Sequence, residues 1–522
     1  MLKQSYFLII TFTFTAALVF GQSGTLDASF GNNGIVITDF NNRNDNLYSM
    51  EILPDQKIIA IGETDSPGGI GAFLACRYNT DGSLDIDFGE NGFFNVILSG
   101  DVFCRASALQ PDGRIILAGT IYHTNDSTLL EEEDFVLIRL KENGILDSTF
   151  GVYGIVTTNL AGNSYERLKE VFLQNDGKIL AAGDGFNDQV GAFYGMVRYE
   201  SSGQLDTTFG NKGIQVIWEQ FIVQTLKLQT DGKILLGGYG GFGPSDDFEL
   251  RRFEQDGQLD NSFGQGGGVH TDLSGQSDYV DGIIVEPDGK IFVSGGANLT
   301  GGTTDLAFAR YNKDGSLDKS YGNNGFEIIS LGPLSNVFDM VRQRDGKYVL
   351  CGKSNHLDGL MHFLLIRINH DGGLDTTFGN KGVVFTDLDG ATELARALVI
   401  QDDNSIVLGG ASQAPNLNFD FSLARYIVDD VVTSKDYNYK TLSFLISPNP
   451  CKEFISFNVD GSTDAYHCIV YDMSGCVVMD EIFHTNTESK LKVDTNLLIN
   501  GYYTILLEIK SMKGLASFVV EK

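Results

Sequence analysis

The sequence predicts an all-β protein: a seven-bladed β-propeller of four-stranded antiparallel blades, followed by a small C-terminal β-sandwich domain. Three observations carry this prediction. A Leu-Asp pair followed by an aromatic-Gly step recurs seven times between Leu26 and Leu374, and the six intervals average 58 residues. Each repeat contains one continuous apolar run, and the repeats stop near Asp429. Units of this size bury a core only by packing against one another.

Residues 1–21 have the features of a secretory signal peptide. Lys3 supplies positive charge, the run from Tyr6 to Phe20 is almost wholly apolar, and Gly21 is a small residue suited to cleavage. The run is short and leads straight into a turn-rich segment, which favours removal over anchoring. We therefore expect no membrane span after signal removal.

Residues 22–430 form the expected propeller. In the second repeat the apolar segments are GFFNVIL, CRASALQ, RIILAG and DFVLIRL, with a PDGR turn before the third, which predicts a four-stranded antiparallel meander. The third segment is continuously apolar in every repeat, as in KIIAIG and KILLGG, and such runs are buried on both faces. Tandem antiparallel sheets buried on both faces fit propeller blades, whose edges are protected when the ring closes.

An arginine near the end of the fourth segment precedes the Asp of the next Leu-Asp pair by eight residues in six repeats, which indicates a rigid connection between blades. The pairs are Arg77 with Asp85, Arg139 with Asp147, Arg198 with Asp206, Arg252 with Asp260, Arg310 with Asp318 and Arg367 with Asp375. Arg425 lacks such a partner downstream, and Asp27 lacks such an arginine upstream. We expect these two residues to pair and close the ring, because an open solenoid would hold them far apart.

The recurring aspartates and glycines are best explained by turn chemistry, since Asn and Asp accept backbone hydrogen bonds and Gly supplies positive φ. Segments such as NTDGSLD also place oxygen ligands at spacings loosely like calcium loops, so calcium is the alternative to having no cofactor. Two hairpins depart from the PDGK pattern, at Gln56 and Asn404, and we expect them to be less tightly formed.

Strand alternation places the Leu-Asp connections and PDGK turns on one face of the ring and the variable loops on the other. Variable loops on a rigid scaffold are where binding usually resides, so we expect a glycan or protein ligand there, with Tyr122, Tyr239 and Phe242 as aromatic contacts. A metal site at His356, Asp358 and His362 is a weaker hypothesis, because loosely spaced ligands often occur by chance.

Charge excludes two classes of partner. Asp and Glu total 68 against 37 Lys and Arg, so the net charge of −31 opposes binding to nucleic acid or to anionic membranes. The six cysteines show no disulfide framework, and Cys76 and Cys351 occupy positions that are apolar in other repeats. No GxSxG, HExxH or phosphate-binding loop is present.

Two stretches resemble known families. The aromatic-Gly motif and PDGK hairpin, recurring in phase from about Gly24 to Tyr426, resemble the delta-60 repeat family of bacterial proteins, whose members look like β-propellers. After a linker at 431–440, residues 441–522 resemble the type A C-terminal sorting domain of type IX secretion cargo in Bacteroidetes. The matching positions are Pro448, Asn449 and Pro450, then Tyr471, Asp472 and Gly475, then Leu497, Gly501 and Tyr502.

The second resemblance implies handling by the type IX secretion machinery and delivery to the cell surface or the medium. We therefore expect a secreted or surface-displayed propeller that acts as a binding or interaction module rather than an enzyme. Two alternatives stay open: an exported hydrolase or lyase acting on polysaccharide, and a structural surface protein. An enzyme should have one deep pocket whose polar residues break the sevenfold pattern.

Overall fold

The structure is a computed structural model. It describes residues 23–66, 69–124, 131–162, 164–240, 246–299, 303–332, 334–355, 359–428, 440–441, 446–458, 465–472, 477–484, 490–496, 498, 500–509 and 512–520. The expected signal peptide and nearly all of the expected linker lie outside these ranges.

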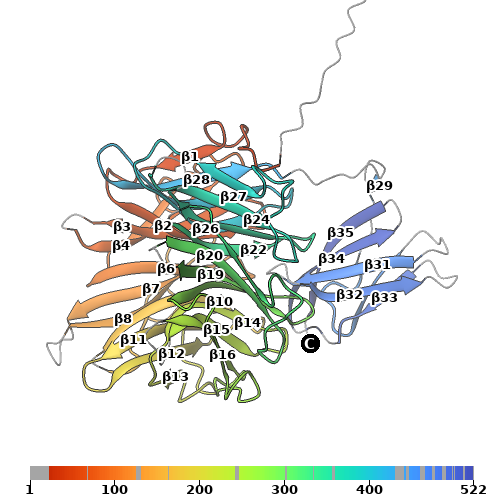
Figure 1. Ribbon diagram of the computed structural model, residues 1–522, viewed down its shortest axis with the longest axis horizontal. Coiled ribbons are helices and arrows are strands. Elements are labelled where there is room, and N and C mark those ends of the chain that lie inside the picture. The colour runs from red at the N-terminus through yellow and green to blue at the C-terminus, as the bar shows by residue number, and fades with distance from the viewer. Residues whose placement is uncertain are drawn as a thin grey trace, which may run out of the picture.

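Strands β1 to β28 form seven four-stranded antiparallel blades (Figure 1). In chain order the first four blades are β2 (Asp45–Ile52), β3 (Ile58–Asp65), β4 (Gly71–Tyr78) and β5 (Phe93–Val96); β6 (Asp101–Leu109), β7 (Ile115–Thr124), β8 (Glu131–Leu140) and β9 (Ile155–Thr158); β10 (Ser164–Leu173), β11 (Ile179–Asn187), β12 (Gly191–Tyr199) and β13 (Ile214–Ile217); β14 (Ile222–Leu228), β15 (Ile234–Gly240), β16 (Asp247–Phe253) and β17 (Gly268–Thr271). The remaining three are β18 (Asp278–Val285), β19 (Ile291–Leu299), β20 (Thr303–Tyr311) and β21 (Phe326–Ile329); β22 (Ser335–Arg342), β23 (Tyr348–Ser354), β24 (His362–Ile368) and β25 (Val383–Thr386); β26 (Glu393–Ile400), β27 (Ile406–Gln413), β28 (Phe419–Tyr426) and β1 (Ile35–Thr38).

The blade boundary lies one strand away from the expected repeat boundary. The segment after the aromatic-Gly motif was expected to begin a meander, but β5 pairs with the preceding β4, with Cys76 opposite Phe93. This segment is therefore the outer strand of the blade before it. The Leu-Asp connection is short enough to turn the chain straight back onto β4, so pairing with the nearest strand prevails.

Ring closure follows from this shift. The last blade receives its outer strand from the beginning of the chain, because β1 pairs with β28 and Ile35 lies opposite Ala424. The Gly379 amide, in the connection from β24 to β25 of the preceding blade, donates to the Ser23 carbonyl at 2.8 Å. The inner strand β2 contacts both β26 and β6, so the inner strands also complete a circle.

The second strand of each blade forms the core, as its continuous apolar sequence predicts. In β3, Ile58, Ile59, Ala60 and Ile61 are all fully buried, and the same holds in the other blades. Successive residues of such a strand point to opposite faces, so each strand contributes to two neighbouring apolar clusters. Each fully buried Ile or Leu stabilises the ring by about 1.5–3 kcal/mol.

The two irregular hairpins are formed as tightly as the others, contrary to expectation. Around Gln56, the Leu53 and Lys57 backbones are joined at 2.9 Å, and the Asn404 hairpin has the corresponding bond at 2.9 Å. Gln56 and Asn404 adopt φ of 68° and 66°, the conformation that Gly holds in the PDGK turns. The hydrogen bonds of the flanking strands impose this conformation on a residue with a side chain.

The C-terminal segment forms two sheets, one ordered β29, β35, β34, β31, β32 and one pairing β30 with β33. Their bounds are β29 (Lys440–Thr441), β30 (Phe454–Asn458), β31 (Ala465–Asp472), β32 (Val477–His484), β33 (Lys490–Asp494), β34 (Gly501–Ile509) and β35 (Met512–Val520). Ile455 and Val493 from one sheet join Ile505 and Phe518 from the other in a single apolar cluster. A β-sandwich remains the prediction for how these sheets pack.

The PNP motif is attached to the last strand of this domain. Asn449 Oδ1 accepts the Val519 N–H at 2.8 Å, and the Cys451 N–H donates to the Val519 carbonyl at 2.7 Å. Gly501 begins β34, whereas Gly475 and Leu497 lie outside the described residues. The motif therefore positions the chain as it enters the domain.

Candidate ligand-binding site

In each blade an arginine contacts both the aspartate of the Leu-Asp pair and the aromatic ring of the following aromatic-Gly step, an arrangement that we call the brace. The arginine on the third strand donates from Nε to Oδ2 of its aspartate at 2.6 to 2.8 Å in six blades, and the Arg425–Asp27 pair has 2.9 Å. Each guanidinium also lies over the ring of the aromatic-Gly step, 4.3 to 5.1 Å from its centroid. The pair across the ring closure thus has the geometry of the other six.

The brace differs from the expected interblade link in one respect. The ion pair lies within a single blade, since Arg77 is on β4 and Asp85 is in the connection from β4 to β5. The contact with the next blade is made by a second guanidinium nitrogen, which in Arg77 donates to the Glu142 carbonyl at 2.8 Å.

Protein donors occupy the brace carboxylates. Asp206 accepts from Arg198 and Lys178 on Oδ2 at 2.6 and 2.7 Å, and from the Thr208 hydroxyl on Oδ1 at 2.6 Å. Burial alone would raise the pKa of Asp206, but these donors hold it well below the usual range. The calcium alternative for this motif is therefore weak, because the oxygens that would bind a cation already accept hydrogen bonds.

Near their middle, the seven inner strands share a bulge that carries seven largely different side chains. Each inner strand shifts register by one residue against its neighbour, for example between Leu47 and Ser49 of β2. A bulge changes the direction in which the side chain of the extra residue points. The bulged residues, which we call the bulge ring, are Tyr48, Arg105, Lys169, Gln224, Asp281, Phe338 and Arg396.

The bulge ring gathers side chains from neighbouring blades into one cluster. The guanidinium groups of Arg105 and Arg396 lie 4.5 and 4.2 Å from the Tyr48 ring centroid, although they come from the blades on either side of it. The Tyr48 hydroxyl donates to Glu63 Oε1 at 3.0 Å, and the Cys104 N–H donates to Glu63 Oε2 at 3.1 Å. Burial raises the pKa of both Tyr48 and Glu63.

Beside another part of the bulge ring lies an aromatic pair. Tyr239 and Tyr279, from successive blades, meet edge to face with centroids 6.2 Å apart. Asn336 donates to the Tyr279 hydroxyl, which fixes that side chain. Lys169 lies 3.8 Å from Asp184, and burial raises the pKa of Asp281 well above its usual value. The cluster thus combines cationic and aromatic surfaces on a repeat-symmetric backbone.

The structure separates the residues that the sequence suggested as ligand contacts. Tyr239 lies in this cluster, whereas Tyr122 lies two blades earlier on β7, where a hydrogen bond with Glu131 raises its pKa to about 12. Phe242 lies outside the described residues.

The suggested metal site is described only in part. His356 and Asp358 lie outside the described residues, while His362 begins β24 and is buried. Its Nδ1 lies 3.4 Å from Glu393 Oε2 and 3.9 Å from Asp387 Oδ1. These neighbours are separated from His362 by 25 or more positions, so local spacing could not reveal them.

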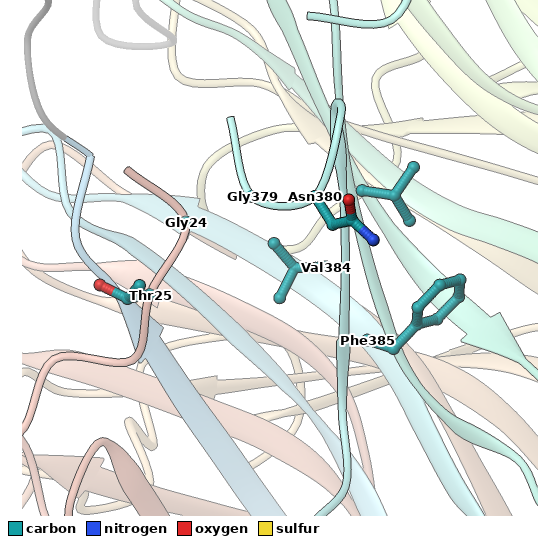
Figure 2. Close-up of a pocket in the computed structure, with 7 residues that line it drawn as sticks. Gly24, Thr25, Gly379, Asn380, Val384 and Phe385 are labelled. Atoms are coloured by element: carbon teal, nitrogen blue, oxygen red, sulfur yellow. The ribbon is translucent and has the colours of Figure 1, made fainter. Parts of the chain in front are cut away.

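Two surface pockets lie on the face of the ring that carries the Leu-Asp connections and PDGK turns, which we call the brace face. One is formed at the ring closure by Gly24, Thr25, Gly379, Asn380, Val383, Val384 and Phe385 (Figure 2). In Figure 2 the N-terminal segment passes on one side and the Val384 and Phe385 side chains on the other. The second pocket is lined by Arg77, Lys141, Glu142 and Asn143. Both occur where braces of adjacent blades meet, so these pockets follow from the repeated architecture.

Family models match most of the repeats and the C-terminal domain. Residues 53–88, 110–150, 174–209, 229–263, 286–321 and 343–378 match the domain of unknown function DUF5122 beta-propeller, and residues 445–521 match the secretion system C-terminal sorting domain. The protein is a DUF5122-type β-propeller with a type IX sorting domain. It is therefore an exported protein, secreted or displayed on the cell surface. The seventh repeat of this propeller is divided between the two ends of the chain.

The chain is similar to several solved structures, each at low sequence identity. A protein of unknown function from Dyadobacter fermentans is 11% identical, with 76% of this chain and 99% of that one covered and a TM-score of 0.43. A catalytically inactive virginiamycin B lyase from Staphylococcus aureus is 9% identical, covering 75% and 98%, with a TM-score of 0.42. Drosophila Semaphorin 1a is 9% identical, covering 75% and 87%, with a TM-score of 0.37. None of the curated proteins compared with the chain matches it. Among the described residues of this propeller, no helix has the length and apolarity to cross a bilayer.

Proposed function

We propose that this exported propeller is a binding module that holds an acidic glycan at the bulge ring. The observation that carries the proposal is the asymmetry of that ring and its surroundings, because the backbone repeats seven times while the side chains on and beside the ring form one arginine-flanked and one tyrosine-lined arc. Structural repetition alone requires no such difference. Recognition of one ligand, by contrast, requires different side chains at equivalent positions.

The chemistry of the ring favours a carboxylate-bearing sugar. Arg105, Arg396 and Lys353 lie near one another, since Arg396 lowers the pKa of Lys353 after the larger effect of burial. This group of cations stands out in a chain whose net charge is −31. Guanidinium groups bind carboxylates in bidentate fashion, and tyrosine rings offer flat faces to sugar rings.

Towards the PDGK turns from the bulge level, neighbouring inner strands are joined by side-chain hydrogen bonds. Ser49 and Ser107 hydroxyls are 2.8 Å apart, and Ser107 donates to Glu51 Oε1 at 3.0 Å. Burial, together with nearby Glu170 and Asp339, raises the pKa of Glu51 to about 7, although the Ser107 hydroxyl and Lys227 lower it. This level of the axis is lined by acids and would repel an acidic ligand.

The test uses the full exported chain on an array of neutral and uronic-acid-bearing glycans, with calcium present or chelated. We expect selective binding to acidic glycans that weakens with salt, and a loss of at least tenfold in the Arg396→Gln variant. Arg344→Gln is the matched control, because Arg344 lies on the brace face beside Asp402 at 3.7 Å. Equal binding by both variants, or preference for neutral glycans, would reject the proposal, and cleavage of a glycan would favour the polysaccharide-active enzyme instead.

A further inference from the structure

Three carboxylates from opposite ends of the propeller chain converge at the ring closure, on the variable-loop face. Asp420 is on β28, Asp39 follows β1, and Asp45 begins β2. One oxygen from each lies within 4.8 Å of the other two. The cluster thus joins the first two strands to the last one and is separate from the bulge ring.

The most buried of the three has an unused oxygen. Asp45 is fully buried, and its Oδ2 accepts the Phe40 N–H at 2.6 Å. Its Oδ1 has no hydrogen-bond partner within normal geometry among the described residues. The Thr64 hydroxyl donates to the Asp65 carbonyl at 3.5 Å, and its proximity lowers the pKa of Asp45, but burial outweighs this effect. A buried oxygen without a donor is costly unless something positive is bound.

The cluster also lacks a basic partner. None of Asp39, Asp45 and Asp420 forms an ion pair in the part of the chain that the structure describes. Burial and then the charges of Asp39 and Asp420 raise the pKa of Asp45 to about 7, while burial and Asp39 raise that of Asp420. Near neutral pH this site therefore requires either protons or a cation.

Equivalent junctions show how unusual this one is. Farther round the ring Asp247, Asp272 and Asp278 form the equivalent cluster of three carboxylates, but there His270 lies 2.8 Å from Asp247 and supplies a basic partner. At another junction, Asp305 accepts the Ser330 hydroxyl at 2.9 Å in place of a second carboxylate. The closure junction alone among these three combines three acids with no basic side chain.

We propose that Asp39, Asp45 and Asp420 bind a divalent cation, Ca²⁺, that ties the first strands of the propeller to the last. Carboxylate oxygens are the ligands that Ca²⁺ prefers, and its flexible coordination suits oxygens held on three separate strands. The absence of His and Cys from the trio disfavours zinc. The exposed Asp39 gives the ion a path from solvent. An exported protein meets calcium outside the cell, so the ion would reinforce the ring after export.

The experiment measures thermal unfolding of the full chain with calcium, with magnesium, and with a chelator. Binding to the folded state alone raises the melting temperature, so we expect calcium to stabilise the wild type and magnesium to do so less. In the Asp45→Asn and Asp420→Asn variants the calcium-dependent increase should fall by at least half. The Asp45→Asn amide oxygen still accepts the Phe40 N–H, so the loop remains supported.

The chelated state gives a second, independent readout. Without calcium, both variants should melt at or above the wild-type temperature, because each removes one of three repelling charges. Asp305→Asn is the matched control at the equivalent register position, and its calcium response should equal that of the wild type. The proposal is wrong if the wild type does not respond, if the two variants respond fully, or if they fail to fold in the chelator.

Discussion

Each residue of the recurring motif has a separate structural task. In the third occurrence, Leu146 bridges back to Leu140, Asp147 accepts from Arg139 at 2.8 Å, and Phe150 lies 4.6 Å beneath that guanidinium. Gly151 has φ of 51°, and a Cβ there would collide with the Ile155 carbonyl oxygen. The motif recurs because every blade needs these four contributions in the connection between its third and fourth strands.

A glycine in a PDGK-type hairpin tests the backbone requirement alone. Gly177 has φ of 84°, and a Cβ there would meet nothing closer than 3.9 Å. We expect Gly177→Ala to lower the free energy of unfolding by about 1–2 kcal/mol, because only the left-handed backbone is penalised. Denaturant unfolding measures this loss. Gly373→Ala is the control, since Gly373 has ordinary φ and a nearest contact of 3.5 Å, and an equal loss there would contradict the explanation.

At the scale of the blade, the brace ties the third strand to the following connection and to the next blade. Two cations share one carboxylate oxygen in Asp375, with Arg367 at 2.8 Å and Lys347 at 3.0 Å. Burial would raise the pKa of Asp375, but the Thr377 hydroxyl, Lys347, the Thr377 N–H and Arg367 lower it to about 2. The folded blade thus favours the charged carboxylate.

This shift predicts an acid-sensitive blade. An aspartate with a pKa near 3.9 when unfolded and about 2 when folded stabilises the protein above pH 4, and that contribution is lost as the pH falls from 4 to 2. Asp375→Asn should therefore cost about 2–4 kcal/mol at pH 7 and have a much smaller effect near pH 2. Chemical unfolding of both forms across this range checks the sign, and a pH-independent difference would show that packing rather than charge is responsible.

The sequence revealed features that repeat and missed features that break the repetition. The pairing of Asp27 with Arg425 could be predicted because six pairs share one offset and only these two residues lack a partner at it. In the structure Arg425 Nε lies 2.9 Å from Asp27 Oδ2. The blade boundary was misplaced because apolar segments show burial but not which neighbour each strand pairs with. Tyr48, Arg105 and Arg396 went unnoticed because a bulge leaves no signature in one sequence. Aligning the repeats on one another would have exposed their variability.

At the scale of the molecule, one short strand completes the ring. Without β1, the last blade would expose the edge of β28, and Arg425 would lose Asp27. Exposed strand edges pair with other chains. The brace of that blade has one cation rather than two, because Ser405 replaces the usual lysine. The pairing of β1 with β28 therefore supports the closure alongside this single ion pair.

Removing β1 should convert the ring into an associating species. We expect a chain that begins after Thr38 to lose its single sharp unfolding transition and to form dimers or larger species, because β28 gains a free edge. Light scattering and calorimetry measure both effects. A synthetic peptide spanning Gly24 to Thr38 should restore the monomer, while a peptide of scrambled sequence should not. A truncated chain that stays monomeric and melts normally would show that β1 is dispensable.

The pairing of Ile35 with Ala424 also sets an order of events during biogenesis. The strand that leaves the ribosome first must wait for the strand made nearly 400 residues later, and contacts so distant in sequence form slowly. While the chain is still being synthesised, its propeller cannot yet be complete. The same division of one blade between the two ends of the chain thus keeps the ring open until synthesis has nearly ended.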